Sequence, residues 1–158
     1  MKNKKNLPAG RQGFTLLELL IVIVILGTLA TFIIIRLTGG EKSARDARRR
    51  SDLRQYQTVI EAYKSSRDGY FPSRVSIQYV TQYLCLDFSL TVCPDDPQSP
   101  TSRYRYVTNG SGSAIINATD YLLWVKLEKP TVNTWFVVCS NGALGEVTVE
   151  PTSYTCPL

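Results

Sequence analysis

An apolar run near the N-terminus is the strongest pattern in the chain. Residues 14–35 read FTLLELLIVIVILGTLATFIII and carry a single charge, that of Glu18. As an α-helix that rises 1.5 Å per residue, this run spans about 33 Å, which is enough to cross the hydrocarbon core of a bilayer. The pattern therefore predicts a membrane helix. Glu18 stands out within it, because a carboxylate in hydrocarbon is costly and is usually paired and functional.

The next pattern is that of an amphipathic helix. Between residues 36 and 67, apolar side chains recur at spacings of three and four residues, which is typical of one buried helix face. We therefore expect one long helix, with Gly27 and Gly39-Gly40 as the places where it would loosen or end. The predicted buried face consists of Leu53, Tyr56, Ile60 and Tyr63, extended toward the N-terminus by Ala44 and Ala47.

Residues 68–158 predict a small antiparallel sheet. The run Asp68-Gly69-Tyr70-Phe71-Pro72 ends the long helix, and residues 75–84 have the pattern of a short second helix. Short turns such as Asn109-Gly110 favour an antiparallel meander. The fold class we predict is α+β, with the long N-terminal helix packed on about four strands. The strand-like runs, rich in aromatic and β-branched residues, are 103–108, 120–127, 134–139 and 145–149.

The formal net charge of +5 is unevenly distributed. Residues 1–13 contain Lys2, Lys4, Lys5 and Arg11 but no acid, so the basic character lies largely at the start of the chain. This distribution argues against a nucleic-acid partner. A second basic cluster alternates with acidic residues, which favours a solvated helix face with charge pairs four residues apart; a contact with DNA or anionic lipid is the alternative. That cluster consists of Arg36, Lys42, Arg45, Arg48, Arg49 and Arg50.

The composition removes most catalytic chemistry. The chain has no histidine, which excludes Ser-His-Asp and Cys-His catalysis and every histidine metal site. Asp95 and Asp96 form a weak calcium candidate, because calcium requires six to eight oxygen ligands, and we favour an ordinary turn there. We expect no enzymatic activity and, apart from that calcium, no cofactor.

Aromatic residues in the strand-like runs admit two interpretations. Tyr104, Tyr106, Trp124 and Trp135 suit core and cross-strand packing, which we favour. The alternative is a platform that binds a sugar or a single-stranded nucleic acid.

Four cysteines indicate an oxidising compartment, since disulfides persist outside the cytoplasm. They form no CxxC pair, and they allow three pairings. The most local pairing joins Cys85 to Cys93 and Cys139 to Cys156; four buried thiols are the alternative. A Cys139–Cys156 bridge would contribute about 3 kcal/mol in the chain-entropy model.

The residues GFTLLELL at 13–20 carry a resemblance to a known family. With a short basic leader before them and an apolar helix after them, they resemble the class III signal of type IV pilins and type II secretion pseudopilins. The resemblance implies that a prepilin peptidase cuts between Gly13 and Phe14 and methylates the new amino group of Phe14. It also places Glu18 where the family keeps the glutamate that guides subunit docking.

Other features of the family match only in part. The Gly69-Tyr70 turn resembles that of pseudopilins, whereas a Cys139–Cys156 bridge would resemble the C-terminal disulfide loop of many type IV pilins. Some pseudopilins bind calcium in a loop, as Asp95 and Asp96 would. The chain departs from the family near residue 35, where many members have a proline and this chain has Ile35 and Arg36.

The main functional prediction is a structural subunit of a type IV pilus (fimbrium). The implied partners are the prepilin peptidase, the bacterial inner membrane, identical or related subunits, and a pilus or secretion assembly machinery. The precursor would lie in the inner membrane and the filament in the periplasm or outside the cell. One alternative is a type II secretion pseudopilin, and another is a single-pass membrane-anchored binding or enzyme domain. The predicted parts are a leader (1–13), a filament-core helix (14–35), an amphipathic half-helix (36–67) and a globular domain (68–158).

Overall fold

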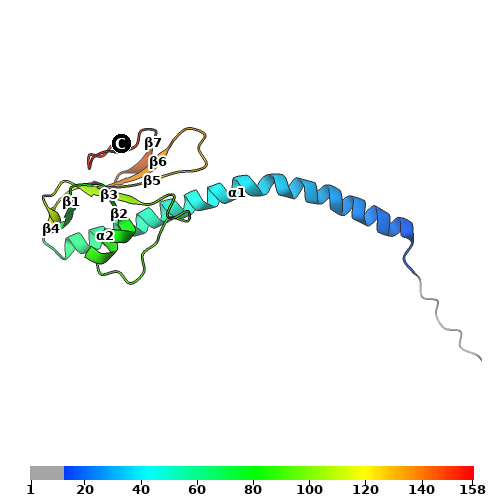
Figure 1. Cartoon of the computed structure of the whole chain (residues 1–158), viewed down its shortest axis with the longest axis horizontal. Coiled ribbons are helices and arrows are strands. Elements are labelled where there is room, and N and C mark those ends of the chain that lie inside the picture. The colour runs from blue at the N-terminus through cyan, green and yellow to red at the C-terminus, as the bar shows by residue number, and fades with distance from the viewer. Residues whose placement is uncertain (1–12) are drawn as a thin grey trace, which may run out of the picture. The chain divides into compact units, whose positions relative to one another are not determined.

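The computed structural model describes residues 13–158, except for the side chains of residues 32–39. It divides into two units, Met1–Thr38 and Gly39–Leu158. Helix α1, Leu16–Ser65, belongs to both units (Figure 1). The helix continues through Gly27 and Gly39-Gly40, so the expected break at these glycines does not occur. Residues 1–12, which make up nearly all of the predicted leader, and the side chain of Arg36 lie outside the described part.

The second unit contains the end of α1, a short helix and seven strands in two antiparallel sheets. The larger sheet has the strand order β2-β3-β5-β6-β7, and the smaller one pairs β1 with β4. The elements are α2 (Val80–Asp87), β1 (Phe71–Arg74), β2 (Gln78–Tyr79), β3 (Arg105–Thr108), β4 (Ser113–Ala118), β5 (Tyr121–Lys126), β6 (Trp135–Cys139) and β7 (Leu144–Val147).

Each face of the larger sheet has its own apolar cluster, because alternate side chains of a strand point to opposite faces. Tyr121 and Leu123 of β5 belong to the cluster that contains the α1 residues Leu53, Tyr56 and Ile60. The neighbouring β5 residues, Leu122 and Trp124, pack instead with Val137, Cys139 and the C-terminal Cys156. Within this unit, Figure 1 shows α1 and α2 on one side of the sheet and the C-terminal segment on the other.

The α+β prediction is confirmed, as is the antiparallel character of the sheet. Three of the four predicted strand-like runs contain one strand each, β3, β5 or β6, and the run 145–149 overlaps β7, which begins one residue earlier, at Leu144. The predicted stripe is also correct at Leu53, Tyr56 and Ile60, which are buried, and at Tyr63, which packs against the same cluster. Ala44 and Ala47 are exposed, however, so the stripe does not extend through them.

Three short strands were not predicted. β1 contains Pro72, which lacks a backbone N–H and therefore argued against a strand. Its partner β4 lies between β3 and β5 in the sequence and leaves the meander to pair Phe71 with Ala118. β2 pairs Gln78 with Tyr106 of β3, so the second helix begins at Val80 rather than at residue 75. All three result from pairings between distant segments, which override local preference.

Two disulfides join the cysteines in the most local of the three possible pairings. Cys85 of α2 is bonded to Cys93 in the following loop, with Cα atoms 6.1 Å apart. Cys139 of β6 is bonded to Cys156, with Cα atoms 5.6 Å apart. The second bridge attaches the C-terminal segment to the sheet face that it covers.

Candidate assembly segment and buried ion-pair cluster

The start of α1 has a defined cap. Gly13, Phe14 and Thr15 precede the helix, and the side-chain oxygen of Thr15 accepts a hydrogen bond of 3.2 Å from the backbone N–H of Glu18. A threonine followed three residues later by a glutamate is the sequence of a capping box. The conformation around Glu18 is therefore set by local hydrogen bonding, and the glutamate lies in the first turn, where the helix dipole favours a negative charge.

The first unit has an apolar surface on every side of the helix. The leucine, isoleucine and valine side chains from Leu16 to Leu29 are between 46% and 88% exposed. Phe14, just before the helix, is 82% exposed. A helix that is hydrophobic all round is stable only in an apolar environment, such as a bilayer or a bundle of similar helices. We call residues 13–31, the part of this unit with described side chains, the assembly segment.

Within the described residues, we find no helix with the length and apolar character that crossing a membrane requires. The predicted membrane run, 14–35, ends in residues whose side chains lie outside the described part.

The second unit is organised around a buried arginine of α1. The Arg49 side chain is 0% exposed and forms a two-pronged ion pair with Asp96, through Nε–Oδ2 at 2.7 Å and Nη2–Oδ1 at 2.8 Å. Its Nη1 also donates to Asp46 at 2.9 Å and to Glu128 at 2.5 Å. One guanidinium thus connects the helix to two segments that are distant in the sequence, the loop at Asp96 and the segment after β5.

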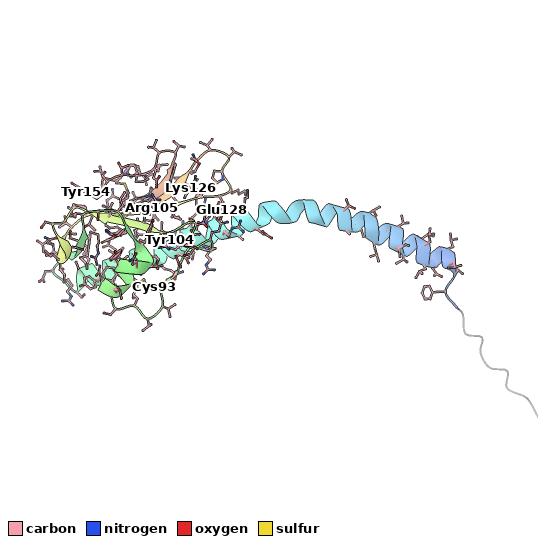
Figure 2. The ribbon with its side chains drawn as sticks, viewed as in Figure 1. Cys93, Tyr104, Arg105, Lys126, Glu128 and Tyr154 are labelled. Atoms are coloured by element: carbon pink, nitrogen blue, oxygen red, sulfur yellow. A yellow bond between two sulfur atoms is a disulfide. The ribbon has the colours of Figure 1, made fainter. Side chains whose placement is uncertain are left out.

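The carboxylates around Arg49 have further donors. Asp46 accepts hydrogen bonds from the backbone N–H groups of Glu128 and Lys129, at 2.9 and 2.8 Å. Glu128 also pairs with Arg45, with an Nη2–Oε2 distance of 2.7 Å. We call Arg45, Asp46, Arg49, Asp96 and Glu128 the ion-pair cluster; Figure 2 labels Glu128 close to α1.

Burial and pairing act against each other in this cluster. Burial alone would lower the pKa of Arg49, but its hydrogen bonds and its attraction to Asp96 outweigh that effect, so the pKa is raised above its ordinary value. Burial likewise would raise the pKa of Asp96, but Arg49 lowers it overall. The hydrogen bond from Arg45 is the main reason that the pKa of Glu128 is lowered. All three groups are therefore held in their charged forms.

The interpretation of the basic cluster as a solvated helix face is wrong for Arg49. Pairs four residues apart do occur, between Arg45 and Glu41 and between Arg48 and Asp52. Arg49 and Asp46, however, continue the three- and four-residue spacing of Leu53, so they lie on the buried face of the helix. That spacing could have predicted that both residues are buried, but charged residues are normally expected to be exposed. Arg50 pairs with Glu146 of β7 at 2.5 Å.

The structure also places the weak calcium candidates. Both carboxylate oxygens of Asp96 bind Arg49, and Asp95 accepts a hydrogen bond of 2.8 Å from the backbone N–H of Asp96. Among the described residues, no group of three or more aspartate, glutamate or cysteine side chains is arranged to hold a metal ion. The expectation of an ordinary turn at Asp95 and Asp96, with calcium as the weaker candidate, stays a prediction.

The four aromatic candidates do not form one platform. Tyr104 and Tyr106 are buried on the helix side of the sheet, and Trp124 and Trp135 belong to the opposite cluster. The Tyr104 hydroxyl donates to Asp52 at 2.6 Å. The favoured interpretation, core and cross-strand packing, is confirmed for all four, since Trp124 and Trp135 are buried as well.

Comparison with known proteins bears on the assembly segment. Residues 8–34 match the prokaryotic N-terminal methylation motif. The chain is 37% identical over 60 residues to the type II secretion system core protein G of Pectobacterium carotovorum, which covers 38% of each chain. It is 35% identical over 68 residues to the core protein G of Klebsiella pneumoniae, covering 43% of this chain and 49% of that protein.

The N-terminal part of the chain carries the sequence pattern of the type IV pilin and pseudopilin family. The names of these relatives agree with the expectation of a structural subunit rather than an enzyme. The chain spans less than half the length of the curated relatives that it matches. No solved structure matches it.

The first prediction concerns the ion-pair cluster of the second unit. Arg49→Met leaves Asp46 and Asp96 buried without their cation, so we expect the free energy of unfolding to fall by about 3–5 kcal/mol. Urea unfolding of the full chain in detergent measures this. The matched control is Arg54→Met on the exposed side of α1, which should change stability by less than about 0.5 kcal/mol. A loss below about 1 kcal/mol for Arg49→Met would contradict a large contribution of the ion-pair cluster to the stability of the domain.

The second prediction is a pH dependence of stability. The pKa values of Asp96 and Glu128 are lowered in the folded state, so their contribution is complete above the ordinary carboxyl pKa of about 4. It is lost as the pH falls through the lower folded-state values. Urea unfolding between about pH 5 and pH 2 should show this loss, because protonation occurs in that window. Asp96→Asn, which cannot titrate, should flatten the slope; an unchanged slope in this variant would refute the assignment to Asp96.

Proposed function

We propose that this chain is a pseudopilin, a structural subunit of the pilus-like filament of a type II secretion system. The observation that carries the proposal is the similarity to type II secretion system core protein G, which extends over 60–68 residues and so beyond the methylation motif at residues 8–34. The surface pilus, which the sequence alone ranked first, becomes the second candidate. In this proposal the precursor is anchored in the inner membrane and the domain lies in the periplasm.

Processing at Gly13 is the first step of the proposed function. A prepilin peptidase would cut between Gly13 and Phe14 and methylate the amino group of Phe14. The local structure supports this site, because Gly13 and Phe14 precede the first turn of α1 and are exposed. A protease acts most readily on exposed, non-helical backbone.

Docking through Glu18 is the second step. Cleavage would create a positive amine on Phe14, and in apolar surroundings this amine attracts the carboxylate of Glu18 on an adjacent subunit. Neither charge is easily buried alone, so the pair would act chiefly on register and docking. The exposed leucines, isoleucines and valines of the assembly segment would then supply most of the stabilisation of the filament core.

The experiment that tests this function is peptide mass spectrometry of the N-terminus in two fractions, cell membranes and material sheared from the cell surface. We expect methylated peptides that begin at Phe14, predominantly in membranes. Abundant methylated Phe14 peptides in the sheared fraction would favour the surface pilus instead. Peptides that run intact through Gly13 in both fractions would overturn processing by the peptidase.

The third prediction concerns docking. Glu18→Ala should be inserted and cleaved normally, but its incorporation into filaments should fall about tenfold or more, because the amine loses its buried partner. The cap is preserved in this variant, since the backbone N–H of Glu18, and not its side chain, donates to Thr15. Crosslinking of assembled subunits, quantified against total processed protein, measures incorporation.

Two variants control this experiment. Glu18→Gln keeps the size and polarity of the side chain and removes its charge, so it should also assemble poorly. Leu20→Ala removes apolar surface two residues away and keeps Glu18, so its defect should be smaller. Normal filament yield from Glu18→Ala would contradict the docking role.

A further inference from the structure

A groove lies beside the outer face of the sheet, on the side away from α1. It has a volume of about 290 Å³ and is lined by residues of β3, β5 and β6 together with the loop before β3. Cross-strand pairing puts Arg105 opposite Trp124, and Lys126 opposite Trp135. The C-terminal segment adds Glu150. We call this the basic groove; Figure 2 labels Arg105 and Lys126 on the sheet.

The basic groove carries an excess of positive charge. Its charged residues are Arg103, Arg105, Lys126 and Glu150, three cations and one carboxylate. Arg105 is paired with Glu150. Among the described residues, Arg103 and Lys126 have no carboxylate within ion-pair distance, so their charges are not neutralised within the domain. A concave surface of one charge sign concentrates the field and attracts small ions of the opposite sign.

Aromatic rings hold both of these cations. The Arg103 guanidinium lies 4.7 Å from the centre of the Tyr79 ring, and the Lys126 ammonium lies 5.8 Å from the centre of the Trp135 ring. Both contacts are within the range of cation–π attraction. The cations are therefore positioned before any ligand arrives, which reduces the entropic cost of binding.

The remaining lining residues select for a ligand with hydroxyl groups. Thr101 can donate and accept hydrogen bonds, and the Glu150 carboxylate and the Ser102 oxygen, whose proton is donated to Asp96, can accept them. The indole N–H of Trp124, which lines the groove, has no acceptor among the described residues. A volume of about 290 Å³ is at the lower end of small-molecule sites, so the ligand is compact.

We propose that the basic groove binds a sugar acid, a single pyranose ring that bears a carboxylate. The carboxylate would accept hydrogen bonds from Arg103 and Lys126, and the ring hydroxyls would bond to Thr101, Ser102 and Glu150. All of these residues lie in the second unit and none in the assembly segment. The binding activity therefore goes beyond the proposed filament role and can be tested separately from it.

The chain offers a built-in probe of this site. It contains two tryptophans, Trp124 and Trp135, and both line the basic groove. We would titrate glucuronate into the full chain and follow tryptophan fluorescence, with calorimetry as a second measurement. The detergent should have a polyoxyethylene headgroup, which carries neither sugar nor charge. The expected result is saturable binding with a Kd of about 1 mM or lower, weakened by added salt.

Ligand controls separate the two parts of the proposed recognition. Glucose keeps the ring and lacks the acid, and acetate keeps the acid and lacks the ring. Both should bind at least about tenfold more weakly than glucuronate, because each loses charged or hydroxyl contacts. Acetate or inorganic phosphate binding as tightly as glucuronate would overturn the sugar-acid assignment in favour of a bare anion site.

Protein variants locate the site. Arg103→Gln and Lys126→Met should each raise the Kd for glucuronate about tenfold, since each removes a charged donor. The matched control, Arg54→Gln, removes an exposed charge on α1 and should leave the Kd unchanged. Urea midpoints equal to that of the unsubstituted chain would show that the variants are folded. No binding by the unsubstituted chain, or equal weakening by the control, would overturn the proposal.

Discussion

The buried guanidinium of Arg49 is the interaction on which the second unit depends. It joins α1 to the loop at Asp96 and to Glu128 after β5, segments that apolar packing alone would position less specifically. A buried ion pair often adds little net stability, because desolvation offsets the attraction between the charges. Its geometric demands are strict, however, since five N–H donors must each face an acceptor. The cluster therefore fixes where the helix sits along the sheet, and the apolar residues Leu53, Tyr56 and Ile60 then pack in that register.

The parts that could be predicted from the sequence are those with local, repeated signals. The apolar run, the stripe from Leu53 to Tyr63 and the strand-like runs each repeat at the period of their element. β1 and β4 could not be predicted, because they are stabilised by pairing with each other across a long stretch of chain. Arg49 was misassigned for a different reason: charge normally predicts exposure, and only its distant carboxylates make burial possible. In the assembly segment, the cap could have been predicted, because Thr15 and Glu18 have the three-residue spacing of a capping box.

The two units differ in where their side chains find contacts. In the second unit, the core apolar groups are buried against one another and the charged groups of the ion-pair cluster find partners within the chain. In the assembly segment, leucines and isoleucines are exposed on every side, and they require surroundings that the chain itself does not provide. The match to the methylation motif lies at the assembly segment, whereas the proposed basic groove lies in the second unit. The proposed filament role and the proposed binding role therefore depend on separate parts of the chain.

The sequence distance between Arg49 and its partners has a consequence for biosynthesis. Asp96 and Glu128 follow Arg49 by 47 and 79 residues, so a growing chain exposes the arginine well before either carboxylate exists. Contacts between such distant residues form late, because a long loop must close first. Until then, the only carboxylate of the cluster that is available to Arg49 is Asp46, three residues earlier on α1. The position of the helix along the sheet is therefore fixed by this cluster only after residue 128 has been synthesised.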